Sequence, residues 1–340
     1  MTPGKPWRRV WTRPRPHRSP ESSFRCANDH FTKQLTLVFP LCEYPLRPSR
    51  EHRSLHIALQ KKMPGTETTK EFMQHEIESF EDDAAKDRQF VTALARGLEI
   101  LRCFRPGETY LTNSEMAKRT AMPKPTISRL TYTLTKLGYL SYSPDQGRYQ
   151  LGAAVLALGY TLLANLDVRK LARPAMQELA EYAQCSVAIG IRDRLSMVYV
   201  EACRGSAAVT LRRDAGSRIP LATTAMGKAY LCGLPQNDRD FLMDHIRLQT
   251  ETNWPKIKAD LEQGFKDYQD RGFVLSSGLW DANISAVGVP LIDPDVNKTM
   301  AFNCGGPSFL LPQEKLIDDL GPRLVQLVRG VEMSMGRHLG

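Results

Sequence analysis

Residues 111–140 read LTNSEMAKRTAMPKPTISRLTYTLTKLGYL, and this stretch decides the fold of the first domain. Its first helix pattern opens with Thr112 and Glu115, three residues apart, which is the spacing of a capping box. Pro123 or Pro125 suits the start of a second helix, where a missing N–H group costs little. Two short helices joined by a tight turn predict a helix-turn-helix, a motif that places its second helix in the DNA major groove.

The second helix has an apolar face and a polar face. Ile127, Leu130, Leu134 and Leu137 recur at helical spacing and are expected to face the core. The opposite face carries hydroxyls and cations, which suit phosphates and base edges. The expected DNA-binding residues, taken from this helix and its flanks, are Thr112, Lys124, Pro125, Thr126, Ser128, Arg129, Tyr132, Thr133, Lys136 and Arg148. The alternative is a small helical subdomain whose basic face is merely solvated.

The segments on either side complete a winged motif. Tyr139–Leu151 has the pattern of a β-hairpin that turns at residues 143–147, and a hairpin directly after the second helix is expected to form a wing. Residues 88–104 predict a helix that braces the motif. Its apolar stripe consists of Val91, Leu94, Leu98 and Leu101, with Phe104 extending it.

The charge of the chain is unevenly distributed. The formal net charge is +9, yet residues 86–150 hold 11 basic and 5 acidic side chains while residues 151–340 hold 21 of each. A basic module beside a neutral one fits nucleic-acid binding through the first module only. We expect a basic disordered extension over residues 1–62, with Met63 as the natural start, and an acidic leader over 63–87. The extension is alternatively a basic tail that adds nonspecific DNA affinity, or a targeting segment.

Several classes of protein are disfavoured by composition. The seven cysteines include no C-x-x-C pair, and four of the seven histidines precede residue 62, so we expect no metal site and no cofactor. Scattered thiols suggest a reducing cytoplasm. The apolar run Leu151–Leu166 is too short and too interrupted to span a bilayer, so no membrane partner is expected. It predicts a linker helix over 151–167 that packs on another helix or on its twin in a dimer.

A second domain is expected over residues 168–338, after the winged helix-turn-helix of 88–150. Irregularly alternating strands and helices predict an α/β domain around a mostly antiparallel sheet, so the chain as a whole is α+β. Gly216–Leu221 is expected to be a loop. The expected strands are Ser186–Ile191, Met197–Ala202, Ala208–Arg213, Phe273–Ser276, Ser285–Ile292 and Met300–Cys304. The expected helices cover Val168–Ala183, Thr223–Leu231, Asp238–Ile246, Trp254–Arg271 and Pro312–Gly336.

Five motifs in order resemble the isocitrate-lyase-regulator (IclR) family of bacterial transcription factors over roughly residues 89–336. They are VTALARGLEIL (91–101), KPTISRLTYTLTKLGYL (124–140), RYQLGAAVLALG (148–159), GSRIPLATTAMGKAYL (216–231) and NISAVGVPLID (283–293). The resemblance implies a winged helix-turn-helix, a linker helix and a GAF-like effector-binding domain. The chain departs from relatives at Ala121, where many have Gly, and at Asn283 and Ser285, where relatives often have Gly and Arg. A non-Gly residue in a left-handed turn at Ala121 would carry strain of roughly 1 kcal/mol.

The resemblance also implies an effector pocket between the sheet and the Gly216–Gly227 segment, where a carboxylate-bearing metabolite meets the start of a helix. The residues agree, because a loop that leads into a helix N-terminus beside Thr223 offers N–H groups and hydroxyls to an anion. The expected effector-binding residues are Thr224, Ala225, Met226, Gly227, Asn283, Ser285, Ala286, Asn303 and Cys304. Alternatively, the threonines merely cap a helix and Cys304 is a packed core thiol.

The leading functional hypothesis is a ligand-responsive regulator of transcription, and repression is the commoner mode in similar proteins. It would bind a pseudo-palindromic double-stranded DNA operator as a homodimer or homotetramer, with a carboxylate or aromatic acid as effector. One alternative is a sensor that acts through protein partners without DNA. Another is an enzyme with Cys304 as nucleophile, although no histidine is persuasively placed as its base.

Overall fold

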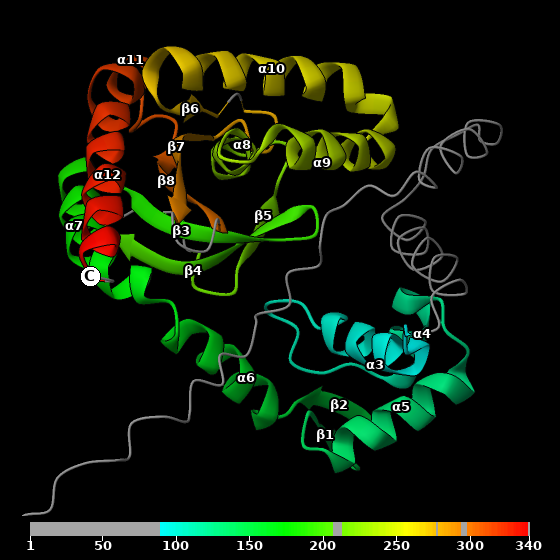
Figure 1. Ribbon diagram of the computed structural model, residues 1–340. Helices are drawn as coiled ribbons and strands as arrows, with labels where there is room; N and C mark the ends of the chain where they lie inside the picture. The colour runs from blue at the N-terminus through cyan, green and yellow to red at the C-terminus, as the bar shows by residue number, and fades with distance from the viewer. Residues whose placement is uncertain (1–88, 207–212, 277, 294–297, 339–340) are drawn as a thin grey trace, which may run out of the picture. The chain divides into compact units, whose positions relative to one another are not determined.

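The computed structural model describes residues 89–206, 213–276, 278–293 and 298–338 (Figure 1). The extension and the leader expected over residues 1–87 lie outside these ranges. The described part begins with a small helical domain, continues through a linker helix and ends in a larger sheet domain, so the chain is α+β.

The small domain is a helix-turn-helix with a wing. Helices α3 (Thr92–Arg102), α4 (Asn113–Thr120) and α5 (Lys124–Lys136) are followed by strands β1 (Leu140–Ser143) and β2 (Arg148–Leu151), which pair antiparallel. A backbone bridge from Leu111 to Tyr149 ties the segment before α4 to the wing. The buried core of this domain consists of Ile100, Cys103, Leu111, Met116, Met122, Ile127, Leu134 and Leu140.

Only the C-terminal part of the apolar stripe of α3 contacts this core, because Leu101 and Phe104 pack against it. Val91, Leu94 and Leu98 are 61%, 63% and 51% exposed, whereas Gly97 and Ile100 are buried. The small Gly97 lets α3 approach α5, because a Cβ at Gly97 would lie 3.9 Å from the Leu130 side chain.

Leu137 does not lie in the core, contrary to expectation. It is 62% exposed, because it is the C-cap residue that follows the last turn of α5. The buried residues of α5 are Ile127, Thr131 and Leu134, and the hydroxyl of Thr131 donates to the carbonyl of Ile127 at 2.9 Å.

The linker helix α6 (Ala153–Ala164) has no buried residue. Leu156, Leu158 and Tyr160 are 74%, 61% and 69% exposed. Each end of the helix is tied to its neighbours: the N–H of Gly152 donates to the carbonyl of Tyr139 at 2.8 Å, and the Arg169 guanidinium donates to the carbonyl of Leu163 at 2.9 Å.

The large domain is built on a six-stranded antiparallel sheet in the order β5-β4-β3-β8-β7-β6. The strands are β3 (Ser186–Asp193), β4 (Ser196–Arg204), β5 (Arg218–Pro220), β6 (Val274–Leu275), β7 (Ile284–Asp293) and β8 (Lys298–Pro307). The segment Gly216–Leu221 thus contains a short edge strand in place of the expected loop. Most of the strand expected at Ala208–Arg213 lies outside the described residues, and Arg213 itself is not in a strand.

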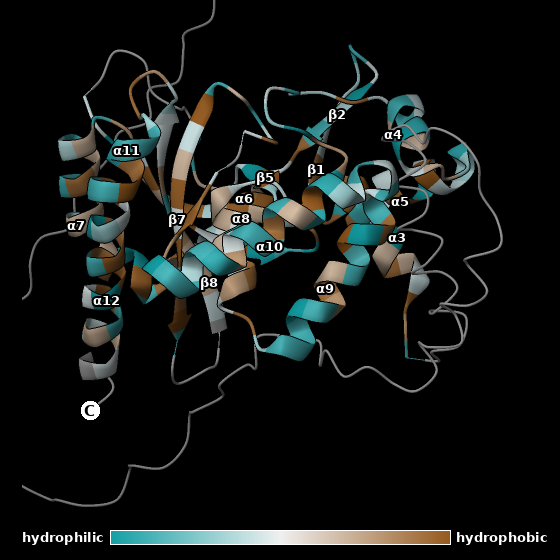
Figure 2. Cartoon of the chain, turned by 90° about the horizontal axis from the view of Figure 1, so that it is seen from above, coloured by the Kyte–Doolittle hydropathy of each residue, from teal (hydrophilic) through white to brown (hydrophobic). Residues whose placement is uncertain are grey.

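Helices cover both faces of the sheet (Figure 1). On one face α7 (Asp167–Ala183) packs beside α12 (Gly321–His338), which follows the short α11 (Gln313–Lys315) and a π-helical turn at Leu316–Leu320. On the other face lie α8 (Ala225–Cys232), α9 (Gln236–Gln249), the 3₁₀ turn Glu251–Asn253 and α10 (Trp254–Arg271). Figure 2 shows that α9 and α10 carry largely hydrophilic residues on the side turned to the viewer, as expected for helices covering a core.

Within the described ranges, no helix is both long enough and apolar enough to cross a bilayer. The same ranges contain no group of three or more His, Cys, Asp and Glu side chains arranged to hold a metal ion.

Candidate functional sites

The turn of the helix-turn-helix is built by local chemistry. Thr112 caps α4: its hydroxyl accepts the N–H of Glu115 at 3.2 Å, and the Glu115 carboxylate accepts the N–H of Thr112 at 2.7 Å, which completes the capping box. Ala121 ends α4 in the left-handed conformation, with φ of 55° and ψ of 11°. Pro123 is the N-cap of α5, and Pro125 lies in its first turn.

The side of α5 turned away from the core forms an exposed polar surface, which we call the α5 face. Lys124, Pro125, Ser128, Arg129, Tyr132, Thr133 and Lys136 are exposed, and Thr126 is half-buried. The ammonium group of Lys136 lies 5.5 Å from the centre of the Tyr132 ring. Thr112 is half-buried at the start of α4, and Arg148 is exposed at the start of β2 in the wing.

The cations of this surface differ from most arginines of the large domain. Among the described residues, no carboxylate lies within 4 Å of Lys124, Arg129, Lys136 or Arg148. Exposed cations without acidic partners keep their full charge available to an anionic surface. Elsewhere in the small domain, by contrast, Arg119 is committed to the carboxylate of Glu108 and to the carbonyl of Cys103.

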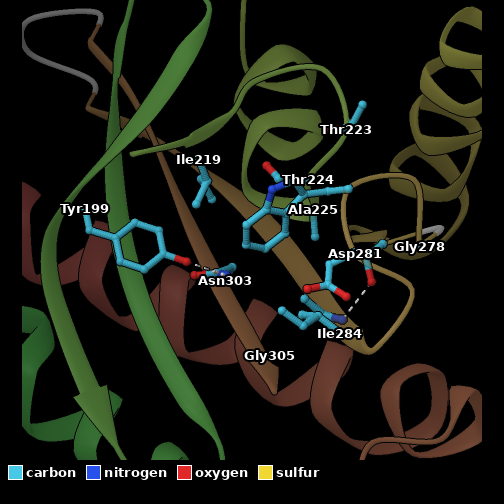
Figure 3. Close-up of a pocket in the computed structure, with 13 residues that line it drawn as sticks. Tyr199, Ile219, Thr223, Thr224, Ala225, Gly278, Asp281, Ile284, Asn303 and Gly305 are labelled. Carbon is cyan, nitrogen blue, oxygen red and sulfur yellow. Dashed lines mark hydrogen bonds between the residues drawn. The ribbon is translucent and has the colours of Figure 1, made fainter. Parts of the chain in front are cut away.

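The large domain contains a cavity between the sheet and the start of α8 (Figure 3). It holds about 400 Å³ of space, counting its open mouth. The lining comes from β4, β5, β7, β8, the start of α8 and the loop before β7. It consists of Tyr199, Ile219, Thr223, Thr224, Ala225, Ser276, Gly278, Trp280, Asp281, Ile284, Ala286, Asn303 and Gly305.

The structure brings some of the expected effector-binding residues to this cavity and not others. Thr224, Ala225, Ala286 and Asn303 line it. Strand alternation explains the rest of β7 and β8, because adjacent side chains point to opposite faces. Ser285 and Cys304 therefore turn away from the cavity, and Asn283 is exposed outside it.

Two residues at the start of α8 are packed inward. Met226 is fully buried in the core between the sheet and the helices. Gly227 allows the helix to cross the preceding segment closely, because a Cβ there would lie 1.9 Å from the carbonyl oxygen of Leu221. The hydroxyl of Thr224 caps α8 by accepting the N–H of Gly227 at 3.2 Å.

Cys304 has the environment of a core thiol. It is fully buried on the α7–α12 side of the sheet, with its sulfur 3.2 Å from that of Cys185. The hydrogen bond with Cys185, together with burial, raises the pKa of the Cys304 thiol well above its ordinary value. A protonated, inaccessible thiol that points away from the cavity is unsuited to nucleophilic attack.

Tyr199 and Asn303 form the deepest polar pair of the cavity, and only Asn303 was expected from the sequence. Tyr199 is 2% exposed and Asn303 is 7% exposed. The Asn303 amide nitrogen donates to the Tyr199 hydroxyl at 3.5 Å, while the Asn303 amide oxygen, also buried, has no partner in the described protein. Burial raises the pKa of Tyr199, so its hydroxyl stays protonated.

The sequence interpretation also missed a cation near the cavity. The guanidinium carbon of Arg213 lies 5.2 Å from the centre of the Trp280 ring, and Trp280 lines the cavity. By contrast, Lys228 is 1% exposed and its ammonium group is bound by both carboxylate oxygens of Asp260, at 2.9 and 3.0 Å. Strand periodicity places Tyr199 on the inner face of β4, but no local pattern pairs Arg213 with a tryptophan 67 positions later.

A buried carboxylate joins the sheet to α7 and to the end of the linker helix. Glu201, 7% exposed, accepts from Arg169 at 3.0 Å and from Arg173 at 2.6 Å. A β-bulge places this carboxylate on the α7 side: Gly190 pairs with Tyr199 and Ile189 with Glu201, which leaves Val200 as the extra residue. Tyr199 therefore faces the cavity while Glu201, two residues later, faces α7.

Comparisons with known proteins cover both domains. Residues 93–144 match the family model described as the IclR helix-turn-helix domain, and residues 160–332 match the model of the bacterial transcriptional regulator IclR C-terminal domain. The chain is 36% identical over 247 residues to the HTH-type transcriptional regulator TsaQ1/TsaQ2 of Comamonas testosteroni, an alignment that spans 72% of this chain and 88% of the relative.

Solved structures agree with these matches. An IclR family transcriptional regulator from Brucella abortus is 49% identical, with a TM-score of 0.68 over 73% of this chain and 94% of that one. An IclR homolog from Microbacterium hydrocarbonoxydans, described as complexed with 4-hydroxybenzoate, is 19% identical and shares the fold, with a TM-score of 0.57 over 72% of this chain and 99% of that one.

Proposed function

The chain belongs to the IclR family of DNA-binding transcriptional regulators, and on this premise we propose that it is a repressor controlled by a small organic acid. In this proposal it occupies a pseudo-palindromic operator as a homodimer or homotetramer, and the acid changes its affinity for that operator. The observation that carries the proposal is the set of cations on the exposed side of α5 that have no carboxylate within 4 Å in the described part of the chain. They lie on a capped helix-turn-helix followed by a wing.

The α5 face supplies the chemistry that operator recognition needs. Arg129 suits a guanine edge, because its planar guanidinium can donate to both the O6 and N7 acceptors. Lys124 and Lys136, near the two ends of the helix, suit phosphates on either side of the groove. Arg148 in the wing adds a cation beside the helix. Ser128 provides a short hydroxyl donor to the same surface. The Thr133 hydroxyl donates to the Arg129 carbonyl at 3.0 Å, so it offers an acceptor there.

The exposed apolar side chains of the small domain and the linker support self-association. Val91, Leu94 and Leu98 on α3 and Leu156 and Tyr160 on α6 are each more than half exposed. A helix that is apolar on all sides, as α6 is, is normally buried by another element. Pairing these surfaces with those of a second copy would bury them, and a dimer would match the two half-sites of a pseudo-palindrome.

The cavity supports an acid as the effector. The first N–H groups of a helix lack intrahelical acceptors, and those at the start of α8 lie beside Thr223 and Thr224 in the cavity wall. Arg213, which lies over the Trp280 ring, adds a cation near the cavity, close enough to act electrostatically on Tyr199. Asp281 is the one acidic residue of the lining, and one of its carboxylate oxygens already accepts the N–H of Asn283 at 2.9 Å.

The Glu201 network offers a route by which the acid would control the operator. Tyr199 and Glu201 are separated in β4 only by Val200, and Glu201 binds the same Arg169 that donates to Leu163 at the end of α6. In thermodynamic terms, the acid must bind the DNA-competent and incompetent states with different affinities, and by linkage DNA then changes the affinity for the acid by the same factor.

The proposal is tested by footprinting the full chain on the DNA upstream of its own gene. We expect a protected, pseudo-symmetric site that Arg129→Ala weakens by roughly 1–3 kcal/mol, as expected for loss of a bidentate base contact. The matched control is Arg271→Ala, which removes an exposed arginine from the end of α10. A footprint that Arg129→Ala leaves unchanged would overturn the role of Arg129, and absence of any specific footprint would favour a sensor acting through protein partners.

A further inference from the structure

The polar pair at the inner wall of the cavity has hydrogen-bonding capacity that the protein leaves unused. The Asn303 amide oxygen is one of only four buried side-chain atoms without a partner in the described residues, and it is the one that belongs to the cavity lining. The hydroxyl of Tyr199 accepts from Asn303, so its own hydrogen remains free to donate. The cavity wall therefore presents one acceptor and one donor side by side.

This arrangement lowers the stability of the folded protein unless a bound group completes the hydrogen bonds of Asn303. A buried polar atom without a partner destabilises the folded protein, whereas a leucine of similar size in the same place would carry no such penalty. Interchanging the amide nitrogen and oxygen of Asn303 does not remove the problem, since one of the two atoms still lacks a protein partner. An asparagine kept in this position points to a ligand group that completes its hydrogen bonds.

A hydroxyl group has the required chemistry. It can donate to the Asn303 oxygen and at the same time accept from the Tyr199 hydroxyl, and it can equally satisfy the amide in its other orientation. A methyl group can do neither, and an ether oxygen can accept from Tyr199 but cannot donate to Asn303. With the amide oriented as in the structure, a second carboxylate would meet the Asn303 oxygen acceptor to acceptor. Ala286 and Gly305, which line the same part of the cavity, contribute no bulky side chain.

The opposite wall accepts the other end of the ligand. Thr223, Thr224 and Ala225 lie across the cavity from Tyr199 and Asn303 (Figure 3). We propose that the effector is a hydroxylated organic acid, with its carboxylate at the start of α8 and a hydroxyl at the far end held by Asn303 and Tyr199. The inference rests on the proposed function of the cavity and adds the second polar group of the ligand and the two residues that recognise it.

The test uses pairs of acids that differ only in the hydroxyl. Isothermal titration of the full chain compares benzoate with 3- and 4-hydroxybenzoate, and butyrate with 4-hydroxybutyrate. In at least one pair we expect the hydroxylated acid to bind the wild type about tenfold more tightly or better, because a site built to bond a hydroxyl strongly rejects the analogue without it. Asn303→Leu should remove this preference, so that the hydroxylated acid and its parent acid bind this variant with affinities within about threefold of each other.

Two further variants make the result specific. Tyr199→Phe removes only one of the two partners and should reduce the preference partially. Asn283→Leu is the matched control, because it makes the same substitution at an exposed residue outside the cavity and should leave the preference unchanged. Thermal melting of the unliganded proteins checks folding, and Asn303→Leu should melt at or above the wild-type temperature because it removes the unpaired buried amide.

The outcomes distinguish hydroxyl recognition by Asn303 and Tyr199 from the broader proposal that an acid binds the cavity. If acids bind but the hydroxyl brings no gain in any pair, or the gain survives in Asn303→Leu, this inference is overturned and the acid-responsive regulator stands. If none of the acids binds the wild type, both the acid effector and this inference are refuted, while operator footprinting still tests the DNA-binding role separately. If Asn303→Leu does not fold, Tyr199→Phe decides: an undiminished preference in that variant overturns the inference.

Discussion

Replacing Lys136 by alanine should reduce the dependence of operator affinity on salt. Lys136 lies in the last turn of α5, exposed, with its ammonium group over the Tyr132 ring and without a carboxylate within 4 Å. Lys124, Lys136 and Arg148 in both copies of the proposed dimer would make about six phosphate contacts, while Arg129 contacts a base edge. Counterion release from the six phosphates then gives a slope of log affinity against log salt of about −5.5.

The substitution removes one cation from each copy, so the slope should become shallower by about two units, to roughly −3.5. The measurement is fluorescence anisotropy of a labelled operator between about 50 and 200 mM salt, the range over which such contacts strongly affect affinity. Lys170→Ala is the control, because it removes a lysine of α7 that is 70% exposed and bound to Asp167. An unchanged slope in Lys136→Ala would show that Lys136 does not neutralise a phosphate.

Three other predictions test features of the packing. Ala121→Gly should stabilise the small domain by roughly 0.5 kcal/mol, because relief of left-handed strain outweighs the greater freedom of the unfolded chain, and its denaturant midpoint measures this. Lys228→Met should destabilise the large domain by about 3 kcal/mol, because it leaves the carboxylate of Asp260 unpaired. Adding Asp260→Leu to the same chain should restore most of the lost melting temperature. A double variant that melts no higher than Lys228→Met would contradict this prediction. Burial raises the pKa of Cys103 to about 11 and that of Cys232 to about 12, so iodoacetamide should label both thiols slowly at pH 8 and faster as the pH rises, as mass spectrometry would report.

Local sequence signals predicted the small domain well because its chemistry is local. The capping box of Thr112 and Glu115, the prolines at the start of α5 and the turn of the wing each act within a few residues. The face of α3 could not be assigned in the same way. A stripe of Val91, Leu94 and Leu98 shows that one side of a helix is apolar, but periodicity does not say whether that side meets its own core or another surface.

The cavity depended on strand alternation and on long-range contacts. Asn303 and Cys304 were both expected in it, and a difference of one position in β8 placed them on opposite faces of the sheet. The bulge at Val200 shifts the alternation of β4 in a way that no residue type signals. The edge strand β5 has only three residues, too few to show a period. Arg213 and Trp280 meet only because the tertiary fold brings two distant loops together.

The linker helix is fastened at its ends and unsupported in its middle. Gly152 bonds it to the wing, and Arg169 bonds its last turn to the Glu201 network. Near its centre stands Gly159, where an added methyl group would touch nothing within 4 Å and where glycine costs about 1 kcal/mol of helix stability relative to alanine. Because both ends of α6 are attached to neighbouring elements, the helix should bend most easily at its least stable residue. A change of angle between the winged helix-turn-helix and the large domain would therefore bend α6 at Gly159.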